Sequence, residues 1–177
     1  DEQVIFPHSL GIFYTAITQY LGFPNYGDEY KVMGLAPYGD NNFEEEISEL
    51  IFLKNNGKFE LNLNYFLHTK KWKAQQWDNG IPIIENQYSD KFFQLLGQPR
   101  VKNGPISKRH KDIAFSTQIQ YEKTLFHILN NLYLKYNSEN LALAGGCAAN
   151  SVANGKITKN TPFKNVYVQA AAGDAGG

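Results

Sequence analysis

The longest run of regularly spaced apolar residues lies between His110 and Tyr136, and it constrains the fold more than any other segment. Side chains spaced by three and four residues fall on one face of an α-helix, because the helix turns once in ~3.6 residues. We therefore predict one long amphipathic helix over this segment. Its apolar stripe would consist of Ile113, Phe115, Ile119, Leu125, Ile128, Leu129 and Leu132.

Shorter patterned segments precede this helix. Residues 9–21 carry apolar side chains at helical spacing after Ser9, a residue type that commonly caps helix starts, so we predict a helix there. Residues 64–87 show no sustained period, and we interpret them as an irregular insertion. Local signals also predict a short helix over 27–35, a third helix over 40–50, a hairpin over 51–63 and a helix over 88–96.

The residues after the long helix have the order of an α/β unit. A short apolar run over 141–144 leads into Gly145-Gly146, a helix is expected over 148–156, and a second apolar run covers 166–168. Because this order is typical of chains that alternate strands and helices, we predict an α/β core.

Composition limits the class of protein. The 177 residues suit one domain, and 42% hydrophobic with 19% charged residues is a globular composition. Seventeen basic residues balance seventeen acidic ones, so the chain lacks the long-range positive field that concentrates proteins on nucleic acid or anionic lipid. We therefore do not expect a nucleic-acid partner.

Cysteine content and hydropathy favour the cytoplasm. The single cysteine, Cys147, excludes an intramolecular disulfide, and no run of about 18 apolar residues could span a bilayer. The first residues are not those of a secretory signal, so we expect a cytoplasmic protein with no membrane partner. The small-residue run over 170–177 should lead into further chain, and we expect the sequence to be part of a longer protein.

The glycine pair between the predicted strand and helix is the strongest candidate for a binding loop. Glycines there let the backbone approach a ligand closely and expose helix amides, so Gly145, Gly146 and Asn150 suit a nucleotide. A tight structural turn with Asn150 in a structural hydrogen bond is an equally good interpretation. We interpret Cys147 as a small buried thiol and not as a nucleophile.

Two acidic positions are further candidates. Asp28 or Glu29 could hold a ribose while Lys31 faces phosphate, although solvated surface charge explains the same residues. Asp174 stands among small residues that would leave its carboxylate open to a metal or a hydroxyl, and a helix N-cap is the alternative.

Taken in order, five segments resemble one known family. Residues 8–18, 27–39, 110–118, 144–150 and 171–177 are similar to motifs of the carbamoyltransferase family that includes nodulation protein U and the antibiotic-tailoring O-carbamoyltransferases. The resemblance implies the second half of an actin/Hsp70/sugar-kinase-like (ASKHA) α/β fold with an irregular insertion. Its parts would be a helical first segment (1–40), a variable insertion (41–105) and a nucleotide-side α/β core (106–177).

The resemblance also implies an activity. In this family one domain makes carbamoyl-adenylate from ATP and carbamoyl phosphate, and the domain similar to this chain passes the carbamoyl group to a hydroxyl of a small-molecule acceptor. By the same resemblance Gly145, Gly146 and Asn150 match the adenosine-side loop. Asp28, Glu29 and Lys31 match a helix that lines the nucleotide, and Asp174 matches an aspartate that binds a divalent metal such as iron or magnesium.

The family's paired metal-binding histidines and first phosphate loop precede the region that resembles this chain, and its adenylate-forming domain follows that region. We therefore expect residues 1–177 alone to bind metal weakly or not at all and to be inactive. A transferase of the tRNA threonylcarbamoyladenosine type is an alternative, which the neutral charge disfavours. A nucleotide-binding module without catalysis is another. All three require the loop at Gly145, the helix near Asp28 and the terminal Asp174 to converge on one cleft.

Overall fold

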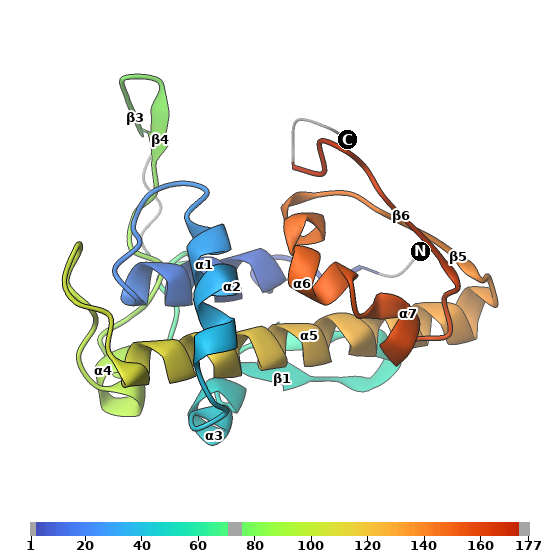
Figure 1. Cartoon of the computed structure of the whole chain (residues 1–177), viewed down its shortest axis with the longest axis horizontal. Coiled ribbons are helices and arrows are strands. Elements are labelled where there is room, and N and C mark those ends of the chain that lie inside the picture. The colour runs from blue at the N-terminus through green and yellow to red at the C-terminus, as the bar shows by residue number, and fades with distance from the viewer. Residues whose placement is uncertain (1–2, 71–75, 174–177) are drawn as a thin grey trace.

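A computed structural model describes residues 3–70 and 76–173 of the chain (Figure 1). The helices are α1 Leu10–Tyr20, α2 Glu29–Leu35, α3 Glu44–Ser48, α4 Lys91–Leu96, α5 Lys108–Tyr136, α6 Ser151–Asn154 and α7 Ile157–Asn160. The strands are β1 Ile51–Leu53, β2 Phe59–Leu61, β3 Gln76–Asp78, β4 Ile81–Ile83, β5 Asn140–Leu143 and β6 Asn165–Val168. Short 3-10 helices occur at η1 Ala36–Tyr38, η2 Asn55–Gly57 and η3 Gly146–Ala149.

The long helix is confirmed as α5, which runs along the molecule beneath most other elements in Figure 1. It begins two residues before the predicted start, where Ser107 and His110 form a capping box. It ends at Asn137, whose left-handed conformation (φ 49°) stops further helical hydrogen bonding. Helix α1 is also confirmed, with the Ser9 side chain accepting from the amide of Ile12.

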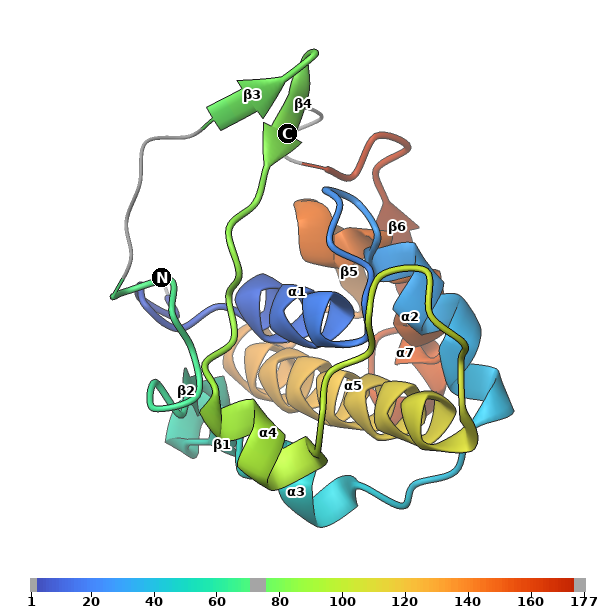
Figure 2. The same ribbon diagram turned by 90° about the vertical axis from the view of Figure 1, so that its left-hand side faces the viewer.

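The larger hydrophobic core lies between α1 and the first half of α5, which run side by side in Figure 2. Helices α2 and α3 and the β1–β2 hairpin cover this pair. Gly39 lets the chain after η1 pass close to α5, because a Cβ at this position would collide with the backbone of Lys111. The fully buried members of this core include Phe13, Ile17, Tyr20, Val32, Ile47, Phe66, Phe92 and Ile113.

A smaller hydrophobic core lies at the other end of α5. Leu129 of α5 packs there with Leu141 of β5, Ile157 of α7 and Phe163. Leu125 of α5 packs against both cores. The single helix α5 therefore joins two hydrophobic clusters that are otherwise built from different parts of the chain.

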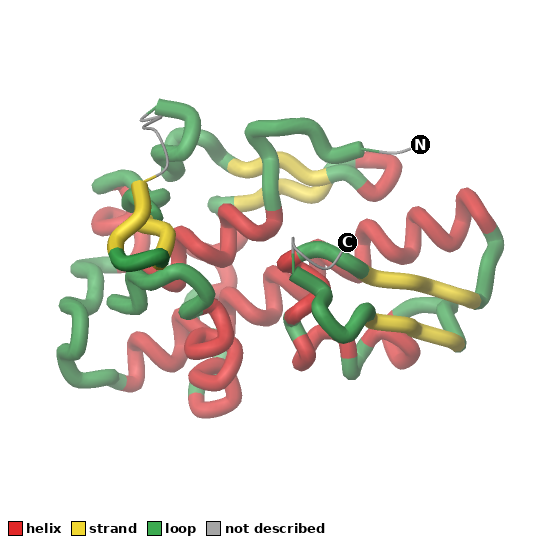
Figure 3. Tube along the Cα trace, turned by 90° about the horizontal axis from the view of Figure 1, so that it is seen from above, coloured by secondary structure: helices red, strands yellow, loops and turns green. Residues whose placement is uncertain are grey.

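The strands form three separate two-stranded sheets, which lie apart in Figure 3. Strands β1 and β2 pair antiparallel, as the predicted hairpin requires. Strands β5 and β6 pair parallel, with Leu141 opposite Val166. A turn and short helices lie between these two strands, so the predicted order of strand, turn, helix and strand is confirmed. The chain is thus mixed α/β, and the actin/Hsp70/sugar-kinase-like fold stays a prediction.

The description of residues 64–87 as irregular was wrong in part. Strands β3 and β4 pair antiparallel across Asn79-Gly80, and both turn residues have positive φ (49° and 79°). An Asn-Gly pair favours such hairpin turns because both residues tolerate the left-handed region. The hairpin projects from the body of the molecule in Figures 1 and 2.

Several predicted helices are shorter than expected or divided. Helix α3 occupies only Glu44–Ser48 of residues 40–50, and α4 begins at Lys91 instead of residue 88. The single helix predicted over 148–156 was wrong in part: η3 and α6 cover most of this range as two separate pieces, and α7 follows it. Asn150 separates η3 from α6, because its ψ of 87° is not helical and its side chain caps the next turn.

Candidate functional site

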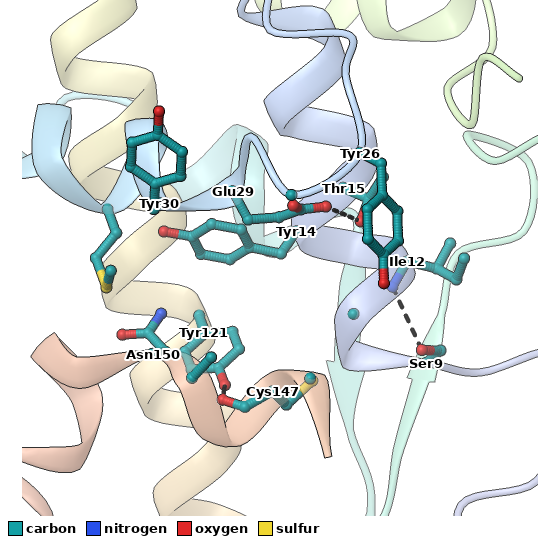
Figure 4. A pocket seen from close by; sticks show the side chains of 15 residues that line it. Ser9, Ile12, Tyr14, Thr15, Tyr26, Glu29, Tyr30, Tyr121, Cys147 and Asn150 are labelled. Carbon is teal, nitrogen blue, oxygen red and sulfur yellow. Dashed lines mark hydrogen bonds between the residues drawn. The ribbon is translucent and has the colours of Figure 1, made fainter. Parts of the chain in front are cut away.

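One cavity lies where α1, α2, α5 and the turn η3 meet (Figure 4). Its volume of about 590 Å³ is within the usual range of small-molecule sites. Segments that are far apart in sequence therefore form one concave surface. The lining residues are Ser9, Gly11, Ile12, Tyr14, Thr15, Tyr26, Gly27, Glu29, Tyr30, Met33, Tyr121, Gly146, Cys147, Ala149 and Asn150.

The wall from α1 and α2 carries one carboxylate. The Thr15 hydroxyl of α1 donates to Glu29 Oε1 at 2.7 Å, and this contact fixes the first turn of α2 against α1 (Figure 4). Gly27, which precedes α2, has a φ of 81° that other residues rarely adopt. The turn at Gly27 and the hydrogen bond from Thr15 together place the half-buried Glu29 at the cavity.

The opposite wall is the turn after β5. Gly145 has φ 91° and ψ 164°, a conformation that is nearly restricted to glycine. The chain then enters η3, so that Gly146, Cys147 and Asn150 line the cavity. Asn150 Oδ1 accepts from the amide of Ala153 at 3.0 Å, which makes it the N-cap of α6.

Tyrosines give the cavity its aromatic character. Tyr14 and Tyr121 are buried and contact edge to face, with ring centroids 5.3 Å apart. Tyr26 and Tyr30 are exposed by 60% and 62%, so their rings are open to a ligand at the mouth. Exposed aromatic faces at the mouth of a cavity are suited to a planar heterocycle.

The hydroxyls of the two inner tyrosines remain protonated at neutral pH. Burial raises the pKa of Tyr14 well above its ordinary value, and the carboxylates of Glu122 and Glu29 raise it further. A contact from the Asn150 amide lowers this pKa, but by less than these effects raise it. The Tyr14 hydroxyl donates to Gln118 Oε1 at 2.8 Å. Burial likewise raises the pKa of Tyr121, whose hydroxyl donates to the Cys147 carbonyl at 2.7 Å.

The structure brings together three of the predicted site residues. Glu29, Gly146 and Asn150 all line the cavity, whereas Gly145 supports the turn from outside the lining. The two walls that were expected to converge therefore do so. Asp174 lies outside the described residues.

Asp28 and Lys31 are turned toward each other and are not among the lining residues. Lys31 Nζ lies 2.6 Å from Asp28 Oδ1, and this hydrogen bond raises the pKa of Lys31. Asp28 Oδ2 accepts from both the backbone and the side-chain nitrogens of Asn25. The pair thus stabilises the loop before α2 in the structure.

Sequence reasoning missed the tyrosines and misjudged one cysteine. Tyr14 and Tyr121 lie on helices that were predicted correctly, but their inward direction depends on how those helices pack. Cys147 packs against the larger core but is only half-buried and also lines the cavity, so the description of a buried thiol was wrong in part. Cys147 lies within η3, which begins at Gly146, whereas the predicted helix would have begun at Ala148.

The described residues do not by themselves fit a metal ion. Across residues 3–70 and 76–173, no three side chains of histidine, cysteine, aspartate or glutamate gather closely enough to hold one. In the same ranges, no helix combines the length and apolar composition needed to cross a membrane.

The fold and the cavity define a mixed α/β protein with a tyrosine-lined cavity where α1, α2, α5 and η3 meet. The sequence matches the family described as carbamoyltransferase N-terminus over residues 1–177. The chain therefore belongs to this family, as its motifs predicted.

Three relatives are similar over nearly the whole chain. An uncharacterized protein of Synechocystis sp. is 41% identical over 99% of the chain. The nodulation protein NolO of Bradyrhizobium diazoefficiens is 34% identical over 99%, and the nodulation protein NolNO of Sinorhizobium fredii is 33% identical over 95%. The chain spans only 27%, 28% and 21% of the lengths of these relatives.

Proposed function

We propose that this chain is the nucleotide-side part of an O-carbamoyltransferase, which transfers a carbamoyl group from carbamoyl-adenylate to a hydroxyl of a small-molecule acceptor. Carbamoyl-adenylate would be made from ATP and carbamoyl phosphate in another domain of the protein. The observation that carries the proposal is the convergence of Glu29 and Asn150 on one cavity, in a chain of this family.

The cavity offers separate contacts for the parts of an adenosine. The open rings of Tyr26 and Tyr30 can stack on adenine, as aromatic side chains do with bases. Glu29 Oε1 accepts from Thr15, which leaves further acceptor capacity on the carboxylate for a ribose hydroxyl. Asn150 lies across the cavity from Glu29 and supplies an amide to the same ligand (Figure 4).

The proposed transfer is a substitution at the carbamoyl carbon. The acceptor oxygen forms a bond to this carbon, the bond from carbon to the phosphate oxygen breaks, AMP leaves and the hydroxyl proton is released. The cavity would hold the adenosine part of carbamoyl-adenylate and so position the reacting carbon. Correct positioning alone can lower the activation barrier of a reaction substantially. The resemblance to the family implies a divalent metal bound by Asp174. We assign this metal no step, because the described residues do not form its site.

The test uses the full-length protein with ATP, carbamoyl phosphate and a panel of sugars and other hydroxylated small molecules. Carbamoylated product and AMP, detected by mass spectrometry, are the expected result. Glu29→Gln should weaken AMP binding by about tenfold or more, since hydrogen bonds to charged groups contribute about 1.5–3 kcal/mol. Lys164→Met is the control, because Lys164 pairs with Glu139 in an exposed contact that does not line the cavity.

Three results would contradict the proposal in different ways. AMP binding without any product over the whole panel would favour a nucleotide-binding module. Modification of tRNA, with binding that weakens steeply as salt rises, would favour the tRNA-type transferase. Unchanged AMP affinity in Glu29→Gln would indicate that AMP does not bind in this cavity.

A further inference from the structure

A chain of polar contacts leads from the cavity into the protein behind it. The Gln118 side chain of α5 exchanges two hydrogen bonds with Asn150: Gln118 Nε2 donates to Asn150 Oδ1 at 3.1 Å, and Asn150 Nδ2 donates to Gln118 Oε1 at 3.0 Å. Gln118 Nε2 also donates to Glu122 Oε1 at 3.0 Å. Lys156 Nζ donates to both Glu122 oxygens, at 2.7 and 2.8 Å.

The interior position of these groups makes their pairing important. Gln118 is 3% exposed and Glu122 is 5% exposed, and buried polar groups are costly unless they are hydrogen-bonded. Lys156 follows α6 and remains 42% exposed at its side chain, so the positive end of the pair reaches solvent. Glu122 and Lys156 are not among the residues that line the cavity.

The carboxylate decides which way both amides face. An ionised Glu122 can only accept, so Gln118 must turn its NH₂ group toward Glu122 and its oxygen toward Tyr14 and Asn150. In this orientation Gln118 Oε1 accepts from Asn150 Nδ2, and Gln118 Nε2 donates to Asn150 Oδ1, so both ends of the Asn150 amide have a fixed partner. The backbone amide of Ala153 holds Asn150 Oδ1 and supports the same orientation.

We propose that Glu122, paired with Lys156, is a positioning residue that sets the orientation of the Asn150 amide in the cavity through Gln118. This inference rests on the proposed function, in which the cavity binds adenosine and Asn150 contacts it. The side-chain amide in Glu122→Gln could accept or donate. Gln118 could then reverse, and Asn150 would lose the partner that fixes its nitrogen.

The test titrates AMP into the full-length protein by calorimetry and compares five variants with the wild type. We expect Glu122→Gln and Lys156→Met to weaken AMP binding by about tenfold, which is similar to the expected effect of Asn150→Ala. Lys156→Arg keeps the positive charge and should restore affinity to within about twofold of wild type. Glu139→Gln removes the acid of an exposed ion pair and serves as the matched control for Glu122→Gln.

A spectroscopic measurement separates positioning from general stability. The side-chain amide resonances of Asn150 can be assigned by their loss in Asn150→Ala in ¹⁵N-labelled protein. They should move in Glu122→Gln and in Lys156→Met, and should stay in place in Glu139→Gln. If Glu122→Gln fails to fold, the comparison of Lys156→Met with Lys156→Arg still decides, because Lys156 is the half-exposed member of the ion pair.

Each contrary outcome identifies its own failure. Wild-type AMP affinity in Glu122→Gln, together with weakened binding in Asn150→Ala, would overturn the positioning role and leave the proposed function intact. Wild-type affinity in both Lys156 variants would overturn the role of the ion pair. Wild-type affinity in Asn150→Ala would instead count against the proposed function.

Discussion

Gln118 and Asn150, 32 residues apart in sequence, hold each other's side-chain amides by one hydrogen bond in each direction. This reciprocal contact ties the turn after β5 to the middle of α5. It also satisfies two polar groups that the packing of α5 against the turn removes from water. The turn that lines the cavity is therefore fixed by a side chain of the longest helix.

Asn150→Ala should destabilise the protein by about 1–3 kcal/mol, because it removes two of the hydrogen bonds of the buried Gln118 amide. Loss of the α6 cap contributes to the same effect. Chemical denaturation of the wild type and the variant measures the difference. Asn165→Ala is the control: Asn165 pairs with Asn140 in an exposed amide contact, and we expect a change within about 0.5 kcal/mol. Equal effects of the two substitutions would contradict this account.

Asp112 should make the fold sensitive to acid. Burial alone would raise the pKa of Asp112, but hydrogen bonds from Lys108, the amide of Asp40 and the side chain of Asn42 lower it below its ordinary value. The folded protein therefore binds this proton less readily than the unfolded chain does. The resulting stability is present above the ordinary aspartate pKa, about 3.9, and is lost as the pH falls through the folded-state pKa.

Denaturation midpoints measured from neutral pH down to about pH 2, a range that crosses the ordinary aspartate pKa, check this expectation. The free energy of unfolding of Asp112→Asn should be lower than that of wild type at neutral pH and should depend less on pH in the acid range. Glu45→Gln, at an exposed carboxylate of α3, should follow the wild-type curve. A wild-type acid dependence in Asp112→Asn would show that other carboxylates are responsible.

Tyr14 should limit stability at alkaline pH. Burial and the nearby carboxylates of Glu122 and Glu29 raise its pKa in the fold, so the unfolded chain loses this proton first. Stability that is full below the ordinary tyrosine pKa, about 10, should then fall as the pH rises beyond it. Tyr14→Phe should have a flatter alkaline profile of unfolding free energy, whereas Tyr167→Phe, at an exposed ring, should keep the wild-type profile. Parallel profiles for all three proteins would refute this assignment.

Gly145→Ala should cost about 1–3 kcal/mol because its backbone conformation is nearly restricted to glycine. A Cβ at Gly145 meets nothing within 4 Å, so the cost would come from the backbone and not from a clash. Gly34 is the matched control, since its Cβ also meets nothing within 4 Å and its place inside α2 favours alanine. Thermal denaturation should show Gly145→Ala destabilised and Gly34→Ala stabilised by about 0.5–1 kcal/mol. Stabilisation by both would contradict the conformational explanation.

The sequence predicted the elements whose signals are local. The apolar spacing of α5, the cap at Ser9 and the glycine turn at Gly145 each reflect residues that are neighbours along the chain. These signals also marked Glu29 and Asn150 as candidates before their common cavity was seen.

Features that depend on packing could not be predicted in the same way. The inward direction of Tyr14 depends on how α1 meets α5, and no local pattern encodes that angle. The partner of Glu122 lies 34 residues away at Lys156, beyond the range of helical spacing rules. The contact between Asp28 and Lys31 is local by comparison, because side chains three residues apart on one helical turn lie close enough to pair.

The contact of Leu125 with both hydrophobic clusters has a consequence for local opening. Neither cluster can loosen without disturbing the same turn of α5, so the helix should open as one cooperative unit. Native-state hydrogen exchange should then give a common slow rate along the middle of α5. Amides of β3, whose side chains are all exposed, should exchange much faster and independently of it.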